Sequence, residues 1–143
     1  MEKILVSECL LGVPCRYDKK SKPNEDVIAL KERYELIPVC PEVLGGLPTP
    51  RTPAEIQGDK VVRCDGVDVT KEYNKGAKKA LEIALKNGCK FAILKSKSPS
   101  CGNKEIYDGT YTKTLINGKG ITARILEKNK ITVINESELH KLK

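Results

Sequence analysis

The chain has 143 residues and a formal net charge of +7, with 39% hydrophobic residues, 31% charged residues and six cysteines. A chain of this length suits one ordinary domain that buries about two-thirds of its extended surface, so a set of disulfides is not needed for folding. No apolar run approaches the roughly 20 residues of a membrane helix, and no basic, apolar and small-residue pattern opens the chain, so we expect neither a signal peptide nor a membrane partner.

The cysteine count and the charge indicate a compartment and classes of partner. The default location is the cytoplasm, where thiols stay reduced, so the six cysteines indicate metal ligands, reactive thiols or core fillers. The positive balance favours polyanions and anionic small molecules. Because the lysines are scattered, and those between residues 78 and 90 equally suit a solvated helix face, charge alone does not establish a nucleic-acid partner.

The first part of the chain predicts two short strands around a helix. An apolar run at 4–6 predicts the first strand, and Asn24 has the chemistry of an N-cap for a helix over 25–34. The apolar run at 36–39 predicts the second strand, although Pro38 within it cannot donate to a strand ladder.

The middle of the chain predicts an irregular segment, a hairpin and the longest helix. Residues 41–53 are rich in Pro and Gly and are expected to be irregular. Residues 55–69 alternate polar and apolar side chains around two turn signals, which predicts a small inserted hairpin. Thr70 is expected to cap a helix that runs to about residue 87, where Gly88 stops it.

The last third predicts two more strands and a helix. Residues 91–94 form an apolar run typical of a buried strand, and 95–120 is a long polar stretch of the kind that is usually functional or mobile. A short helix at 121–128, a strand at 131–134 and a final helical turn at 136–141 are expected to follow.

This alternation of strands and helices predicts an α/β fold with a mainly parallel sheet and helices on both faces. We expect a single three-layer α/β/α domain over residues 1–143, Rossmann-like, with the small hairpin inserted. Neither an internal repeat nor a linker is evident.

Cysteines follow three of the predicted strands at the edge where ligands bind. In open parallel sheets, ligands bind at the carboxyl ends of the strands. Segments far apart in sequence therefore predict one thiol-rich pocket, whose cysteines are Cys9, Cys15, Cys40 and Cys101. Cys64, in the hairpin, and Cys89, at the opposite edge of the sheet, are interpreted as small apolar fillers.

Several kinds of site use clustered thiols. Structural zinc takes four tetrahedral ligands, but the chain lacks paired Cys-x2-Cys knuckles and its one histidine, His140, lies among lysines in an exposed segment. A redox thiol site would typically use Cys-x-x-Cys, which is absent. An iron–sulfur cluster accepts dispersed thiolates, and a four-iron cluster held by three of them leaves one iron open as a soft Lewis acid.

Three polar residues near these cysteines are candidates for chemistry. Glu42, two residues after Cys40, is the acid/base candidate, with a surface glutamate as the alternative. Ser98 either donates to a substrate heteroatom or caps its loop, and Arg51 either holds an anionic or carbonyl group or pairs with Glu55. Neither Gly-x-Gly-x-x-Gly after the first strand nor Gly-x4-Gly-Lys-Ser/Thr occurs, so nucleotide-cofactor chemistry is not supported.

Three motifs together resemble the thiouracil desulfurase family, formerly a domain of unknown function. They are Ser-Glu-Cys-Leu-Leu-Gly with Cys-Arg-Tyr-Asp (7–18), Pro-Val-Cys-Pro-Glu-Val with Gly-Gly-Leu and Pro-Arg-Thr-Pro-Ala-Glu (38–55), and Lys-Ser-Pro-Ser-Cys-Gly (97–102). The resemblance covers almost the whole chain. The chain departs from the pattern at Glu8, where a small residue is common, and at Lys19, where glycine is expected.

The resemblance implies a [4Fe–4S] cluster held by three cysteines, with the remaining iron free for substrate sulfur. It assigns Cys9, Cys15 and Cys101 as ligands and leaves Cys40 as a fourth pocket thiol or a ligand in place of one of these. The implied substrate is a thiolated pyrimidine of the thiouracil or 4-thiouridine type, as a small molecule or within thiolated tRNA. Neither the sequence nor the resemblance indicates an oligomeric state.

The expected reaction is a non-redox hydrolysis of the C–S bond. The resemblance assigns catalytic roles to Glu42, which activates a water, and to Ser98, which orients or protonates the ring. We further expect Arg51 and Ser100 to contact the substrate. Two other interpretations stay open: a non-catalytic metal- or RNA-binding module, and a sulfur carrier that uses Cys40.

Overall fold

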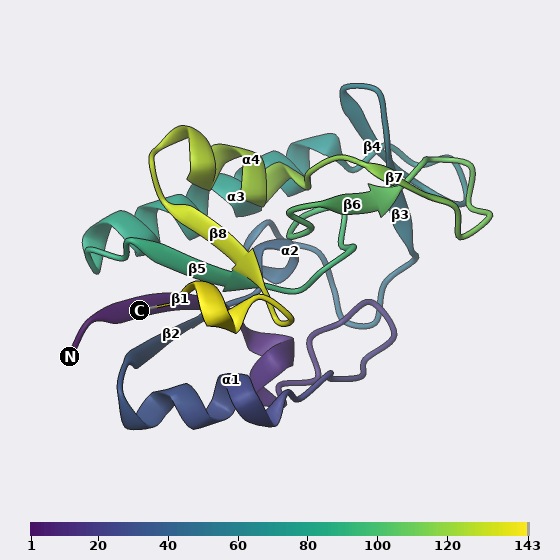
Figure 1. The fold of residues 1–143 in the computed structure, drawn as a ribbon. Coiled ribbons are helices and arrows are strands. Elements are labelled where there is room, and N and C mark those ends of the chain that lie inside the picture. The colour runs from purple at the N-terminus through teal and green to yellow at the C-terminus, as the bar shows by residue number, and fades with distance from the viewer. Residues whose placement is uncertain (143) are drawn as a thin grey trace.

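The centre of the molecule is a parallel four-stranded sheet. The computed structural model describes residues 1–142, and Figure 1 shows the sheet with helices above and below it. Its spatial order is β2-β1-β5-β8, and every neighbouring pair is parallel. The strands are β1 (Lys3–Ser7), β2 (Glu35–Val39), β5 (Phe91–Leu94) and β8 (Thr132–Asn135). The predicted α/β class with a mainly parallel sheet is confirmed.

Helices cover both faces of this sheet. One face carries α1 (Glu25–Ala29), continued by a 3-10 turn at Leu30–Glu32, and the other carries α3 (Thr70–Lys86) and α4 (Ile121–Lys128). Side chains of β1 alternate between the layers: Ile4 and Val6 belong to the cluster on the α1 side, and Leu5 to the cluster under α3 and α4. Three layers therefore form two apolar interfaces from largely aliphatic residues.

The strand order places a switch point between β1 and β5. From β1 the chain crosses to β2 on one side, and later returns to β5 and β8 on the other. Loops at the carboxyl ends of strands on either side of such a point diverge and leave a crevice. Pro38 is accommodated because β2 is an edge strand, where a missing N–H interrupts no second ladder.

The helix ends confirm some of the capping and stop residues expected from the sequence and correct one of them. Asn24 caps α1 as expected, since its side-chain oxygen accepts a hydrogen bond from the Val27 N–H at 3.1 Å. The prediction that Thr70 caps α3 is wrong: Thr70 is the first helical residue, and its N–H donates to Asp68 Oδ1 at 2.8 Å. Gly88 follows the end of α3 with a φ of 66°, a left-handed backbone that glycine adopts without strain.

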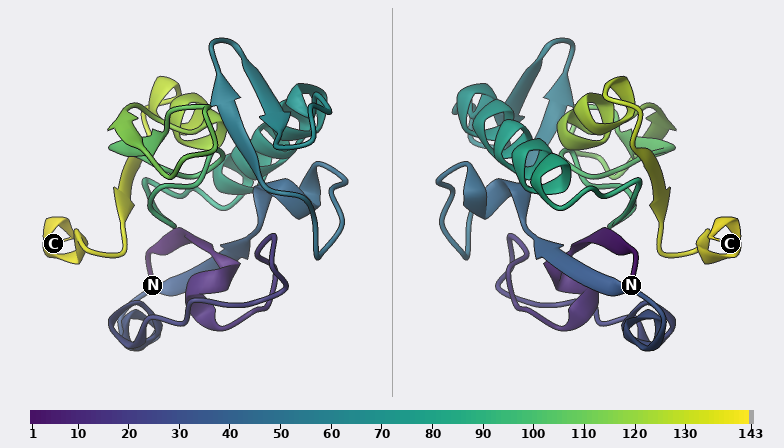
Figure 2. Two further views of the ribbon diagram at one scale, coloured as in Figure 1. Left: turned by 90° about the vertical axis from the view of Figure 1, so that its right-hand side faces the viewer. Right: turned by 90° about the vertical axis from the view of Figure 1, so that its left-hand side faces the viewer.

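Two segments expected to be irregular contain regular structure. Residues 41–53 include the short helix α2 (Pro41–Leu44), which begins with proline at a position where the missing N–H costs nothing. The expected hairpin is confirmed as β3 (Ala54–Gln57) and β4 (Lys60–Arg63). The polar stretch 95–120 forms a second hairpin, β6 (Glu105–Tyr107) and β7 (Leu115–Asn117). Figure 1 shows both hairpins beyond the carboxyl ends of the sheet strands, and Figure 2, left, views the molecule from that side.

The last described residues lie on the α1 side of the sheet, where a short 3-10 turn, η3 (Leu139–Lys141), packs against the cluster that contains Ile4. Over residues 1–142, none of the helices is both long enough and apolar enough to span a bilayer.

Candidate active site

A cavity of about 610 Å³ opens at the carboxyl edge of the sheet. This volume is within the range of small-molecule sites. Its walls come from the loops after β1, β2 and β5 and from the two hairpins. The sequence-predicted residues that line it are Cys9, Cys15, Cys40, Glu42, Arg51, Ser98 and Cys101. The predicted convergence of strand-end residues therefore occurs in the fold.

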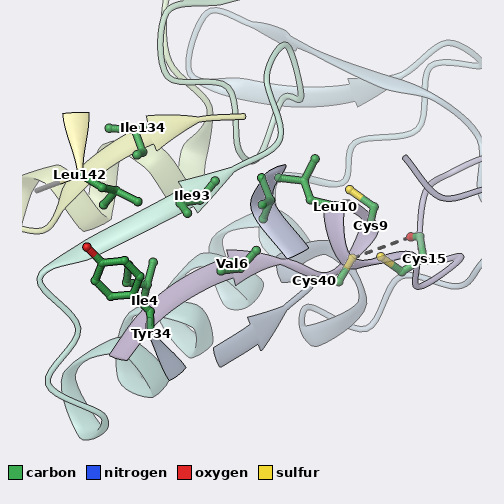
Figure 3. Packing of buried hydrophobic residues seen from close by; sticks show 11 residues of the cluster. Ile4, Val6, Cys9, Leu10, Cys15, Tyr34, Cys40, Ile93, Ile134 and Leu142 are labelled. Atoms are coloured by element: carbon green, nitrogen blue, oxygen red, sulfur yellow. Dashed lines mark hydrogen bonds between the residues drawn. The ribbon is translucent and has the colours of Figure 1, made fainter. Parts of the chain in front are cut away.

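Three of the cysteines lie together at one end of the α1-side core. Cys9 lies in η1 (Glu8–Leu11) directly after β1, Cys40 follows β2, and Cys15 lies in an irregular segment between them in sequence. Figure 3 shows the three at one end of the cluster, whose other members are aliphatic residues and Tyr34. The Cys40 thiol donates to the Cys15 carbonyl oxygen at 3.8 Å, and all three residues are buried.

Cys101 reaches the cavity from the loop after β5. Its Sγ accepts a hydrogen bond from the Ser7 hydroxyl at 3.7 Å, and Ser7 Oγ in turn accepts the Lys95 N–H at 3.0 Å. Ser7 ends β1 and Lys95 directly follows β5, so the hydrogen bond between Ser7 and Lys95 links the ends of the two strands at the switch point. The thiol thus has a defined donor beside it in a buried position.

Contacts between thiols and burial favour the neutral form of Cys15, Cys40 and Cys101. Burial, and then the negative charge of Glu42, raise the pKa of Cys101 to about 12. The contact with Cys40 lowers the pKa of Cys15, but the hydrogen bond with Cys9 and burial outweigh it and raise this pKa to about 11. The hydrogen bond with Cys15 and burial also raise the pKa of Cys40. Ionising several of these thiols together therefore requires a cationic centre among them.

A buried donor beside the thiols lacks an acceptor. Arg51 has a side chain only 6% exposed, and its Nη1 donates to the Cys15 carbonyl oxygen at 3.1 Å. Its Nε is the one buried side-chain nitrogen or oxygen without a hydrogen-bond partner among residues 1–142. A buried unpaired N–H is costly, and thiolates or inorganic sulfide next to it would supply the missing acceptor. The donor set and this free N–H both fit an iron–sulfur cluster.

The same residues do not form a ready-made site for a single ion. Within the described part of the chain, no group of three or more His, Cys, Asp or Glu side chains is arranged to hold one metal ion. The thiolates of an iron–sulfur cluster bind different iron atoms, so they need not meet at one point. His140 is exposed, as expected, and does not line the cavity.

Glu42 is held by two donors at the cavity wall. Arg51 Nη2 forms an ion pair with Glu42 Oε2 at 3.2 Å, and the hydroxyl of Tyr73 donates to the same oxygen at 2.9 Å. The sequence-based alternative, a pair between Arg51 and Glu55, is not formed; Glu55 Oε1 accepts instead from the backbone N–H of Gly109 at 2.9 Å. Glu42 is thus part of a partly buried network and not a free surface glutamate.

Close contact between two helices puts Glu42 in this position. A Cβ on Gly76 of α3 would lie 1.8 Å from the carbonyl oxygen of Pro41, and a Cβ on Gly45 would lie 2.0 Å from that of Glu72. Only glycines at both positions let α2 approach α3 this closely. Because Glu42 follows Pro41 and Tyr73 lies one turn before Gly76, the contact brings carboxylate and phenol together.

Ser98 and Ser100, two residues apart, have different surroundings. Ser98 lines the cavity, and its Oγ accepts the backbone N–H groups of Ser100 at 3.0 Å and Cys101 at 3.1 Å. Ser100 is buried behind the loop, where its hydroxyl pairs with that of Thr122 at 2.7 Å. It is not part of the cavity lining, so the structure does not bring this expected substrate contact into the site.

Other residues differ from their sequence-based interpretation. Cys89 is a buried filler as expected, but Cys64 is exposed at the cavity rim. Tyr73 had no sequence signal, because a tyrosine on the apolar face of a helix is indistinguishable from a core residue. Lys19, expected to be glycine, has a φ of 61°, which is the left-handed conformation that explains a preference for glycine there.

Comparisons with known proteins show the family of the chain. The 2-thiouracil desulfurase family matches residues 4–138. The uncharacterized protein YbbK of Bacillus subtilis (strain 168) is 42% identical over an alignment of 147 positions that covers 96% of this chain and 97% of that protein. A solved structure described as the [4Fe-4S]-dependent thiouracil desulfidase TudS is 46% identical, with a TM-score of 0.91 over 99% of this chain and 95% of its own. The chain therefore belongs to the 2-thiouracil desulfurase family.

Proposed function

We propose that this protein is an iron–sulfur-dependent desulfurase that removes sulfur from thiolated pyrimidines of the thiouracil type. The observation that carries the proposal is the convergence, in one cavity, of four buried thiols with a held carboxylate and a serine hydroxyl. Membership of the family and the likeness to a [4Fe-4S]-dependent thiouracil desulfidase support it. The cytoplasm, where thiols stay reduced, is the proposed location.

Three of the four cysteines would hold a [4Fe–4S] cluster. When bound, a cluster with one iron free of protein thiolate supplies a soft Lewis acid that polarises a thiocarbonyl group. Cys40 lies directly between the end of β2 and the start of α2, whereas Cys15 lies in an irregular segment. Rigid elements place ligands more accurately than loops do, which favours Cys40 over the Cys15 assignment that the family resemblance implied.

Single Cys→Ser variants test this ligand set through bound iron and the visible absorption of the cluster. After anaerobic reconstitution, we expect Cys9→Ser, Cys40→Ser and Cys101→Ser to lose most of both signals and Cys15→Ser to retain them. Cys89→Ser, in the core away from the cavity, is the control for the effect of the substitution itself. If Cys15→Ser loses iron while Cys40→Ser keeps it, the ligand set is Cys9, Cys15 and Cys101.

Glu42 and Ser98 would have different roles in the proton transfers of a hydrolysis. Replacing C=S by C=O consumes one water and releases sulfide, with no net oxidation or reduction. Glu42, whose Oε2 is already held, would take a proton from the attacking water. Ser98 would donate to a ring heteroatom, because both lone pairs of its Oγ are engaged by backbone N–H groups. The surrounding cavity would orient the flat ring and limit competing water.

The Glu42→Gln variant tests the assigned base. With equal cluster content, we expect sulfide release from thiouracil to fall by about 100-fold or more, the usual effect of losing a general base. Glu82→Gln, on the exposed side of α3, controls for the loss of one negative charge. Release at the wild-type rate by Glu42→Gln would show that this carboxylate is not the base.

The charge of the cavity lining suits substrates that carry an anionic group, in addition to the uncharged free base. Six cationic side chains line it: Arg16, Lys22, Arg51, Lys95, Lys97 and Lys113. Parallel assays with thiouracil, its nucleoside, its nucleotide and thiolated tRNA would rank these candidates. A non-catalytic RNA-binding module would bind the RNA without sulfide release, and a Cys40-based sulfur carrier would lose activity on Cys40→Ser while keeping its cluster.

A further inference from the structure

Tyr73 forms the closest contact to the Glu42 carboxylate. Its hydroxyl donates to Glu42 Oε2 at 2.9 Å, although the two residues are 31 positions apart in sequence. Tyr73 is 3% exposed, and it also contributes to the cavity lining. Burial, and then the charge of Glu42, raise the pKa of this phenol well above its usual range, so it stays a proton donor in the hydrogen bond.

Both donors to Glu42 act on the same oxygen. Arg51 Nη2 lies 3.2 Å from Oε2, the atom that Tyr73 also contacts. No hydrogen bond or ion pair engages Oε1 within residues 1–142. One oxygen of the carboxylate is therefore anchored and the other is left for an external partner, which is how an oriented base is built.

The ring of Tyr73 is anchored independently of its hydroxyl. It packs in a separate apolar cluster with Ile56, Val61, Val69 and Ile106, which joins α3 to the two hairpins. The glycine contact between α2 and α3 then fixes the separation of phenol and carboxylate. Removing the oxygen alone would consequently leave the packing of the ring in place while freeing one side of the carboxylate.

We propose that Tyr73 is a positioning residue for the reaction, which holds the Glu42 carboxylate by Oε2 so that Oε1 faces the water it deprotonates. The inference rests on the proposed function, because it assigns Glu42 the role of base. Tyr73 acts through Glu42 and need not touch the substrate. It therefore affects the rate of turnover more than the binding of thiouracil.

The first test is the Tyr73→Phe variant, reconstituted anaerobically and compared at equal cluster content. We expect kcat for sulfide release from thiouracil to fall about tenfold, with KM within twofold of wild type. Tyr34→Phe is the matched control, a buried tyrosine in the other core layer, and should stay within twofold in both constants. An unchanged kcat, or a loss that appears wholly in KM, would overturn the proposal.

The second test combines Tyr73→Phe with Glu42→Gln, measured in long incubations that detect residual turnover. If the phenol acts only through the carboxylate, the double variant is no slower than Glu42→Gln alone. A further tenfold loss in the double variant would show that the hydroxyl acts elsewhere. No sulfide release by the fully loaded wild-type protein defeats the proposed function itself. Wild-type turnover by Glu42→Gln removes the base role of Glu42 and this inference with it, whereas a slow Glu42→Gln beside a fully active Tyr73→Phe defeats only this inference.

Discussion

At the scale of single residues, the two sequence-based alternatives for Ser98 do not exclude each other. The hydroxyl does cap its loop, because it accepts the N–H groups of Ser100 and Cys101. A hydroxyl has two acceptor sites and one donor. With both acceptors engaged, only the O–H remains, so any contact between Ser98 and a substrate in the cavity uses Ser98 as the donor.

Replacing Ser98 by alanine separates these two roles. We expect Ser98→Ala to lower kcat for sulfide release at least tenfold, and to lower the free energy of unfolding by about 1 kcal/mol through the lost cap. Ser98→Thr, which keeps the hydroxyl, should recover most of both. Normal turnover in Ser98→Ala, with only the stability loss, would mean that the hydroxyl caps the loop and has no part in the reaction.

The residues of the site were predictable to different degrees. Cys9, Cys40, Cys101 and Glu42 follow strands that an apolar run identifies, and the carboxyl edge of a parallel sheet brings such positions together. The Arg51–Glu42 pair and the Tyr73 hydroxyl depend on how α2 packs on α3, and no local pattern encodes that. The position of Ser100 outside the cavity lining has a similar cause, because the direction of a side chain in a tight loop is set by contacts, here with Thr122.

At the scale of elements, the crossing of α2 and α3 determines where the carboxylate lies. The two helices meet through Gly45 and Gly76, with no room for a Cβ on either. Tyr73 and Glu42 lie on either side of this contact. A shift of α2 relative to α3 therefore changes the hydrogen bond between the Tyr73 hydroxyl and the Glu42 carboxylate.

Gly76→Ala tests the crossing, because two effects of opposite sign compete. Helix propensity alone would stabilise the protein by about 1 kcal/mol. The clash of the new Cβ, 1.8 Å from the Pro41 carbonyl oxygen, forces a backbone shift that we expect to dominate. A net loss of about 2 kcal/mol in urea unfolding is expected, with Lys75→Ala on the exposed face as the control. A net gain in stability would show that α2 can shift away from the new Cβ at little cost in free energy.

The elements differ in how far sequence predicts them. The runs at β1, β5 and β8 and the periodic α3 are strongly patterned, and all four form where expected. The β6–β7 hairpin lacks such a pattern and is held by tertiary contacts: Glu55 accepts N–H groups of Gly109 and Tyr111, and Gln57 donates to the Gly109 carbonyl. The four-residue α2 is too short for any periodicity, so its packing on α3 maintains it.

At the scale of the whole molecule, a buried carboxylate ties the end of the chain to the loop that carries Cys101. Glu138 is 3% exposed and accepts from Asn103 Nδ2 at 2.8 Å and from the Asn135 N–H at 3.1 Å. Lys104 and Lys141 form ion pairs with it at 2.8 and 2.7 Å. The network joins the end of β8, the loop after β5 and η3 at one point.

This network predicts a specific sensitivity to acid. Burial raises the pKa of Glu138, but the hydrogen bonds from Asn103, Lys104 and Lys141 outweigh it and hold the pKa well below the ordinary 4.5. A carboxyl group with a lowered folded-state pKa contributes stability above its unfolded pKa and loses it as pH falls through the folded one. Stability should therefore decline below about pH 4.5.

Chemical denaturation across pH measures this contribution. We expect Glu138→Gln to be less stable than wild type at pH 7 and to lose less further stability between pH 4.5 and the acid limit. Glu82→Gln, which replaces an exposed carboxyl group on α3, should keep the wild-type dependence of the free energy of unfolding on pH. If the free energy of unfolding falls equally with pH in wild type and Glu138→Gln, the acid sensitivity belongs to other groups.

The measurement that tests the central claim most directly is sulfide release by the anaerobically reconstituted protein, with 2-thiouracil and 4-thiouracil as substrates. The account predicts stoichiometric sulfide and uracil without an added reductant or oxidant, from a brown protein that contains a four-iron cluster, and no release by the protein without its cluster. A fully loaded protein that releases no sulfide from either base, or a colourless protein that retains stoichiometric zinc, would contradict it.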